Sequence, residues 1–279
     1  MPYPNLTGKH AYDALVTPRD LHASRRAHGD LPDLSDVVGV RGAVLCYQPR
    51  ILDRMLERGD ARRIQGAPGE CFLVDAEPDD PDSGQITVCG RFGVGAPVAA
   101  IVMEELIAFG VRRFVSLGTA GCLQRGMAIG DLVLCTEAIR DEGVSYHYLP
   151  PEAPARPTDA LTERLRSGLA ALLAEREPDS PAGAAGALHA GPSWTIDAPF
   201  RETVEEARHY QALGVLTVEM EASALFAVAA HRGVEIASAF VISDSLAELI
   251  WNPRFHDPAV DRGLDTLYAA ARTALLGAG

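Results

Sequence analysis

In the stretch GVLTVEMEASALFAVAAHRG (Gly214–Gly233), a short β-branched run passes directly into a longer alanine-rich run. The first run has the composition of a buried strand, whereas the second has helical spacing and stops at a glycine. At the junction, Glu219 and Glu221 lie on either side of Met220. A carboxylate at a helix start complements the helix dipole, which accounts for one glutamate but not for two beside an apolar segment. The junction therefore predicts a β-to-α transition and a candidate binding site.

The same alternation of short β-rich runs and longer helical runs extends along most of the chain. The further β-rich runs are Val37–Tyr47, Cys71–Asp75, Gln85–Phe92, Arg112–Gly118, Asp131–Arg140, Gly186–Gly191 and Glu235–Ser243. The further helical runs are Ala96–Gly110, Ala160–Glu177 and Ala259–Leu276, and the proline-rich loops are Leu149–Pro157 and Glu177–Pro181. This alternation predicts a buried central sheet covered by helices on both sides. Since no linker interrupts it, we expect one α/β domain at residues 31–279, preceded by an N-terminal arm at residues 1–30.

Composition narrows the class of partner. The chain has 279 residues, 47% of them hydrophobic, and a formal net charge of −13. This charge argues against nucleic acid or an anionic membrane surface as a partner. No secretory or membrane-length apolar run is present, so a cytoplasmic protein is expected. The five cysteines are scattered without a CxxC or Cys/His cluster, so neither a disulfide framework nor a metal site is expected. Four of them lie in apolar surroundings, where we expect buried thiols.

Two glycine-containing segments are candidates for a phosphate or sugar loop. In SLGTAGCLQRG (Ser116–Gly126), Gly118 and Gly121 permit a tight turn, which would bring backbone amides and the Thr119 hydroxyl close to an anion or a sugar. A plain strand-to-loop turn explains the same residues equally well. The other segment, GVGAP (Gly93–Pro97), lacks the third glycine of a dinucleotide fingerprint, which disfavours that function.

A second carboxylate site follows the last β-rich run. In VISDSLAELIW (Val241–Trp251), Asp244 comes directly after apolar residues, where a protonated carboxyl could donate a proton to a leaving group. An N-cap is the alternative, and it is favoured for this residue taken alone. At the junction that contains Glu219 and Glu221, a carboxylate at the strand end could accept two hydrogen bonds from a vicinal diol, such as that of ribose. Met220 would provide an apolar wall for the sugar.

Five segments occur in series: SLGTAGCLQRGMAIGDLVL, IRDEGVSYHYLP, WTIDAPFRET, GVLTVEMEASALF and VISD. In this order and spacing they resemble the nucleoside phosphorylase family that contains the hexameric purine nucleoside and uridine phosphorylases. The resemblance runs from about Val40 to the last helical run. It implies a central mixed sheet bent into a partial barrel, with an active site at a dimer interface within a larger ring, of which a hexamer is the candidate form. It also implies a nucleoside substrate, phosphate as a possible co-substrate and no cofactor.

The resemblance assigns roles to the sugar side of the site. Glu221 would bind the ribose 2′ and 3′ hydroxyls, with Glu219 and Met220 beside it. Thr119 would contact phosphate and sugar, in a loop shaped by Gly118 and Gly121.

On the base side, Asp244 would protonate the purine ring as the glycosidic bond breaks, and Arg254 could assist it. The segment Trp194–Phe200, with Trp194, Pro199 and Phe200, would line the base pocket by aromatic stacking. Where the uridine branch has a glutamine–arginine pair, this chain has Thr203 and Glu205, which favours a purine or modified base over uracil.

The phosphate side departs from the family. Tyr47 stands where a glycine-aspartate-proline turn has its glycine, and Ser116 stands where an arginine would ligate phosphate. Losing such an arginine costs on the order of 2–4 kcal/mol, or about 10²–10³ in rate. The remaining candidates are other arginines that have moved in, such as Arg91, Arg112 or Arg140. Neither Arg50 nor Arg54 is in register with the family's next arginine, and His10 and His22 are too far upstream to match its early histidine.

Three functions remain open. Phosphorolysis of a nucleoside is favoured. A nucleosidase would use water in the same site and needs a base, for which Asp53 is the nearest candidate. A catalytically silent or repurposed nucleoside-binding relative is the third.

Overall fold

Ten strands form one mixed sheet in the computed structural model, which describes residues 4, 6, 8–28, 39–57, 59, 61–64, 69–77, 80–175 and 186–277. Within this part of the chain the strands are β1 (Gly42–Cys46), β2 (Ala61–Ile64), β3 (Glu70–Glu77), β4 (Asp80–Gly90), β5 (Arg113–Cys122), β6 (Leu132–Asp141), β7 (Leu188–Ile196), β8 (Thr217–Glu219), β9 (Glu235–Ser245) and β10 (Asn252–Pro253). Their order is β10-β9-β6-β7-β8-β5-β1-β4-β3-β2.

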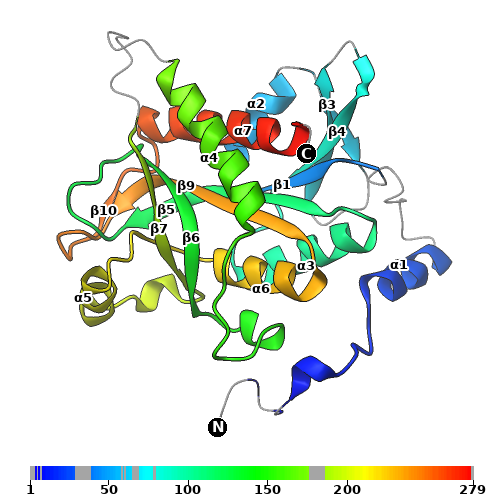
Figure 1. Cartoon of the computed structure of the whole chain (residues 1–279), viewed down its shortest axis with the longest axis horizontal. Helices are drawn as coiled ribbons and strands as arrows, with labels where there is room; N and C mark the ends of the chain where they lie inside the picture. The colour runs from blue at the N-terminus through cyan, green and yellow to red at the C-terminus, as the bar shows by residue number, and fades with distance from the viewer. Residues whose placement is uncertain are drawn as a thin grey trace.

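Five of these strands close into a barrel. The strands β9, β6, β7, β8 and β5 are neighbours in that order, and β5 also pairs in parallel with β9, from Arg113↔Glu235 to Cys122↔Ser245. This pairing closes the ring and leaves β1, β4, β3 and β2 as an open wing beside β5 (Figure 1). The expected α/β fold with a mixed, barrel-like sheet is confirmed.

Helices cover both faces of the sheet. On one face lie α2 (Pro49–Glu57), α4 (Asp159–Ala174) and α7 (Pro258–Leu276), and on the other lie α3 (Ala96–Ala108) and α6 (Ala222–Arg232) (Figure 1). The shorter α5 (Val204–Ala212) lies at the barrel end, and α1 (Pro18–Ala27) packs on α3. Apolar side chains of each helix set fill a separate core on their side of the sheet. No helix in the described ranges is both long and apolar enough to cross a membrane.

Each predicted strand and helix has a counterpart, but the tight turn predicted at Gly118 and Gly121 is wrong. Strand β5 continues through both glycines to Cys122. A Cβ atom at Gly121 would lie 2.9 Å from Leu246 and 3.1 Å from Oδ2 of Asp244. Because the backbone at Gly121 is extended, a turn is not the reason for glycine there. Glycine is required by the close approach of these two side chains.

Other elements had no clear signal in the sequence. Helices α1, α2 and α5 and strand β2 were not predicted, although α5 begins with a Thr203–Glu206 capping box. The residues predicted to form the loop at 177–181, and the expected domain boundary near residue 31, lie outside the described residues. The separate arm at residues 1–30 stays a prediction.

The expectation that the cysteines form no disulfide is wrong for two of them. Cys71 of β3 and Cys89 of β4 face each other in register and form a disulfide. Their sequence separation of 18 contains no recognisable motif, so only the strand register brings them together. Cys46, Cys122 and Cys135 are free and buried, as predicted.

Candidate active site

A cavity of about 430 Å³ lies where β5, β8 and β9 end near the segment that follows β1. Among the described residues that line it are four carboxylic acids and no lysine or arginine. The lining residues are Tyr47, Gln48, Val94, Thr119, Ala120, Gly121, Pro199, Phe200, Glu202, Val218, Glu219, Met220, Glu221, Ser243, Asp244, Leu246, Trp251 and Phe255. A site with this many carboxyl groups favours ligands that donate hydrogen bonds.

The sheet register explains why segments far apart in the sequence meet here. Gly121 of β5 pairs with Asp244 of β9 on one side and with Val218 of β8 on the other. The β5–β9 register shifts between Ala120 and Gly121, so that Asp244 is the partner of Gly121. The three candidate segments of the sequence therefore contribute to one cavity, although the individual roles of their residues stay predictions.

Glu219 is tied to the start of α6. Its Oε2 accepts hydrogen bonds from the backbone N–H groups of Glu221 (2.8 Å) and Ala222 (2.7 Å), and its Oε1 accepts from the hydroxyls of Thr195 (2.5 Å) and Ser193 (3.3 Å). Burial raises its pKa, and these four donors oppose that effect. Glu219 therefore complements the α6 N-terminus, which is the simpler role that the sequence offered for one of the two glutamates.

Glu221 is the less satisfied of the two glutamates. It is the N-cap residue of α6, and its Oε1 accepts a 2.5 Å hydrogen bond from the backbone N–H of Gly95. Burial, followed by the nearby charge of Glu219, raises its pKa to about 8. Gly95 has φ 102°, a conformation that favours glycine, and is itself the N-cap of α3. The GVGAP segment thus supports a carboxylate, a role that its sequence did not indicate.

At another part of the cavity, Asp244 is held by two donors. Its Oδ1 accepts from the Ser243 hydroxyl (2.8 Å), and its Oδ2 accepts from the indole N–H of Trp251 (3.0 Å). Asp244 belongs to β9, and in the following turn the N–H of Ala247 donates to the Ser245 hydroxyl instead, so the alternative interpretation of Asp244 as the N-cap of that turn is wrong. Arg254 donates its backbone N–H to Ser243, and no described contact joins its side chain to Asp244.

Glu202 is a carboxyl group that the sequence analysis missed. It lies between the short helix at Pro199–Arg201 and α5, and it lines the cavity with Asp244. Burial, then the charges of Asp244 and Glu206, raise its pKa to about 7. Glu205, to which the sequence pointed instead, lies exposed on α5.

A family model described as Phosphorylase superfamily matches residues 83–274, which include most of the cavity. The chain belongs to the phosphorylase superfamily. It is 33% identical over 205 residues to a guanosine phosphorylase of Halorubrum lacusprofundi, covering 73% of this chain and 78% of that protein. It is 28% identical over 212 residues to a DeoD-type purine nucleoside phosphorylase of Bacillus cytotoxicus (71% and 84%) and 31% identical over 161 residues to a uridine phosphorylase of Escherichia coli (55% and 61%).

In this member of the nucleoside phosphorylase family, neutral side chains occupy the side expected for phosphate. The Tyr47 hydroxyl lies 3.2 Å from Oγ of Ser116, and Gln48 donates a 2.9 Å hydrogen bond to the hydroxyl of Thr119. Burial, followed by the charge of Glu221, raises the pKa of Tyr47 well above its usual value. Ser116 is buried and Gly118 packs under the Tyr47 ring, so neither lines the cavity directly.

The arginines considered as replacements lie elsewhere. Arg91 pairs with Glu70 (2.6 Å) and Asp53 outside the cavity. Arg112 precedes β5, at the far end of that strand, and Arg140 donates to Ser145 and to the backbone carbonyls of residues 149, 150 and 153. No arginine among the described lining residues takes the place of the missing one.

The predicted base-pocket position of Trp194 is wrong. Its side chain is fully buried, donates a 2.9 Å hydrogen bond to Asp141 and packs against Tyr210. Pro199 and Phe200 do line the cavity, and the tryptophan found there is Trp251. Trp251 lies in the VISDSLAELIW segment, seven residues after Asp244. The sequence spacing alone did not indicate that the two side chains are in contact.

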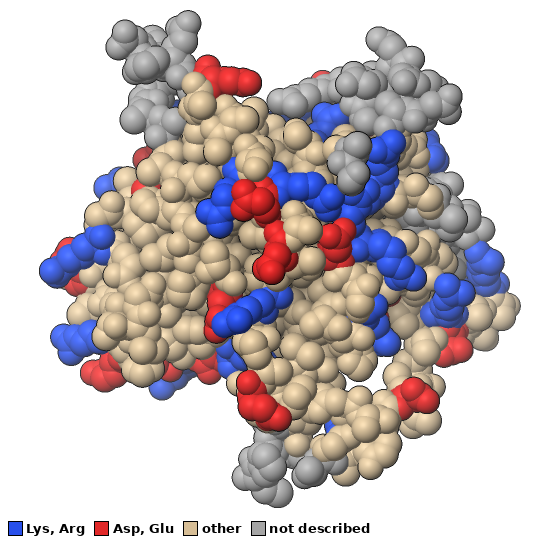
Figure 2. All heavy atoms as spheres, in the orientation of Figure 1, with Lys and Arg blue, Asp and Glu red and all other residues tan. Residues whose placement is uncertain are grey.

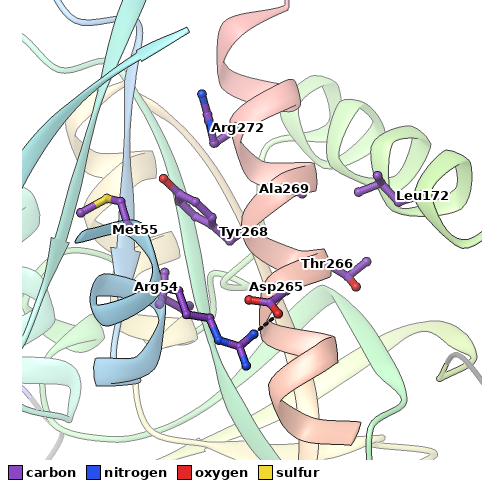
Figure 3. Close-up of a pocket in the computed structure, with 9 residues that line it drawn as sticks. Arg54, Met55, Leu172, Asp265, Thr266, Tyr268, Ala269 and Arg272 are labelled. Carbon is purple, nitrogen blue, oxygen red and sulfur yellow. Dashed lines mark hydrogen bonds and ion pairs between the residues drawn. The ribbon is translucent and has the colours of Figure 1, made fainter. Parts of the chain in front are cut away.

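A second cavity, of about 300 Å³, lies between α2, α4 and α7 (Figure 3). Its Arg54 forms an ion pair with Asp265, and it contains none of the predicted site residues. On the molecular face shown in Figure 2, basic side chains lie next to acidic ones. Neither feature competes with the four-carboxylate cavity as an active site.

Proposed function

We propose that the protein is an enzyme that cleaves the N-glycosidic bond of a purine nucleoside and transfers the pentosyl group to phosphate. The main support is that one cavity combines Thr119, Glu221 and Asp244, which come from three separate segments. These are the residues that the family resemblance assigns to phosphate, ribose and base. The family membership supports the reaction class.

The sugar end of the proposed mechanism rests on Glu221. The Gly95 N–H fixes Oε1, so that the carboxyl group can accept hydrogen bonds from a ribose diol without reorienting. Bond cleavage develops positive charge on the sugar ring, and the ionised form of Glu221, reached as the pH approaches 8, would stabilise that charge. Met220 supplies an apolar wall for the sugar.

The leaving base would be received by Asp244 and Glu202. Asp244 has a hydrogen-bond donor on each oxygen, whereas a pKa of about 7 lets Glu202 carry a proton near neutrality. The proton of Glu202 offers a donor beside the acceptor oxygens of Asp244, which suits the mixed donor–acceptor edge of a purine. This pairing favours a purine or modified base over uracil.

A nucleosidase is the second candidate, because the phosphate side lacks a cation. Tyr47, Gln48 and Thr119 provide only neutral groups, and anion binding normally uses charge-assisted donors. Asp53, the base considered for activating water, is paired with Arg91 and does not line the cavity. Asp53 is therefore not placed to activate water in the cavity, and phosphorolysis, which the family membership supports, remains the preferred function.

Base release from purine and pyrimidine nucleosides, followed by chromatography with and without phosphate, tests the proposal. Release that requires phosphate supports phosphorolysis. Release without phosphate identifies a nucleosidase, and no release from any nucleoside contradicts both functions.

We also propose a cytoplasmic, dimer-based homo-oligomer, with a hexamer as the candidate ring, that uses no cofactor. Exposed apolar residues rim the cavity, with Phe200 fully exposed and Val94 62% exposed, which supports a second copy covering its mouth. Light scattering coupled to gel filtration tests this, and a monomer at micromolar concentration would contradict it.

A further inference from the structure

Trp251 is an aromatic residue of the cavity that the proposed mechanism does not yet use. It lies seven residues after Asp244 and is 60% exposed, yet its indole N–H donates a 3.0 Å hydrogen bond to Oδ2 of that aspartate. The other tryptophan, Trp194, is fully buried away from the cavity. Trp251 is therefore the tryptophan that a bound base could reach.

Main-chain hydrogen bonds around Trp251 hold this residue close to Asp244. Strand β10 pairs antiparallel with the end of β9, with Pro253 opposite Asp244. The N–H of Arg254 donates to the carbonyl of Ser243 at 2.9 Å. Leu249, in the connecting turn, has φ 58°, which is uncommon for a residue with a side chain. These features place Trp251 above the carboxyl group by main-chain pairing as well as by its own hydrogen bond.

The indole restricts how Asp244 can act. Because an indole N–H only donates, Oδ2 serves as an acceptor in this arrangement, while Oδ1 receives the Ser243 hydroxyl. A carboxyl group with a donor on each oxygen cannot rotate without losing a hydrogen bond. A fixed carboxyl plane holds its remaining lone pairs toward a bound base.

We propose that Trp251 is a positioning and specificity residue for the base: its N–H fixes the Asp244 carboxyl group, and its ring provides a stacking face. The exposed ring of Phe255, whose centroid lies 6.2 Å from that of Trp251, extends the same aromatic wall. This inference rests on the proposed function, because it assigns the base end of that site.

Trp251→Phe separates the two roles, since it keeps an aromatic ring and removes the N–H donor. With a purine nucleoside that the wild type cleaves, kcat should fall on the order of 10-fold, while KM changes less than about 3-fold. Trp251→Leu removes the ring as well and should also raise KM. Ile250→Ala is the matched control, because Ile250 is 75% exposed and does not line the cavity, and both its constants should stay near those of the wild type.

A double-mutant cycle distinguishes positioning from a general structural effect. In an Asp244→Ala background, Trp251→Phe should change kcat less than about 2-fold, because the group it positions is absent. The same 10-fold loss in both backgrounds would overturn the positioning role. So would a wild-type kcat in the single Trp251→Phe variant.

Fluorescence tests the inference independently of turnover. Emission from the exposed Trp251 should change when a purine nucleoside is added, and this change should be absent in Trp251→Phe, where only the buried Trp194 remains. Emission of the free protein should also differ between the wild type and Asp244→Ala. If neither change occurs, the inference is wrong even for an active enzyme, whereas a wild type without base release refutes only the proposed function.

Discussion

Replacing Glu221 by glutamine should make the protein more stable at alkaline pH. Burial beside Glu219 raises the pKa of Glu221 to about 8, compared with its usual value of 4.5. A carboxyl group with a raised pKa in the folded state contributes its full stability below pH 4.5. That contribution is lost as the pH rises from 4.5 through about 8, because over this range the unfolded chain releases a proton that the folded protein retains. Glutamine keeps the shape of the protonated acid and does not ionise.

The size of this effect follows from the gap between the two pKa values. At about 1.4 kcal/mol for each pH unit, the gap sets an upper limit of about 5 kcal/mol. Relaxation and water entry reduce such penalties in real proteins, so we expect about 2 kcal/mol. For a chain of 279 residues, an unfolding entropy of about 2.1 cal/mol/K per residue converts this into about 3 °C in Tm.

Differential scanning calorimetry between pH 5 and pH 9 measures this directly. As the pH rises, the Tm of Glu221→Gln should increase relative to that of the wild type. The difference should reach about 3 °C near pH 9. Glu205→Gln is the control, because Glu205 is exposed and its removal should leave the slope with pH unchanged. Parallel curves for Glu221→Gln and the wild type would show that Glu221 ionises freely in the fold, which would refute the reasoning.

Three further predictions concern other parts of the molecule. The rate of purine release should fall as the pH rises through about 7, where Glu202 loses its proton. Glu202→Gln should remove this fall from the pH–rate profile. If the fall is unchanged in that variant, Glu202 is not its source. Gly121→Ala places a methyl group 3.1 Å from Oδ2 of Asp244. It should lower the free energy of unfolding by about 1–3 kcal/mol in urea titrations, and it should reduce kcat more than it raises KM. A wild-type kcat would contradict this expectation. Cys71→Ser removes a disulfide that spans 18 residues and should cost about 3 kcal/mol in the same titration without reductant; thiol titration of the unfolded wild type should find three free thiols, and five would contradict the disulfide.

Local patterns were sufficient for the order of the main elements and for part of the site. Glu219, Met220 and Glu221 are neighbours in sequence at a strand-to-helix junction, so their place at the end of a strand could be predicted from periodicity. Asp244 could be placed at the end of a strand in the same way. The family resemblance then linked these separate segments into one site.

The remaining features depend on contacts between distant strands. The reason for glycine at position 121 is the nearness of Asp244 and Leu246, which follows from the β5–β9 register. Contacts between distant segments also determine that Cys71 pairs with Cys89. They likewise determine that Trp194 is a core residue, whereas Trp251 lines the cavity. Composition and spacing within one segment carry no record of such registers.

A cavity with four carboxyl groups and no described lysine or arginine becomes more favourable for positive charge as those groups ionise. A nucleoside is neutral, but its sugar becomes cationic as the glycosidic bond breaks, so the cavity attracts the transition state more strongly than the substrate. A nucleoside analogue with a protonated nitrogen in place of the ring oxygen should therefore bind more tightly than the nucleoside itself. Its advantage should increase as the pH approaches 8, where Glu221 ionises, provided that the analogue keeps its proton.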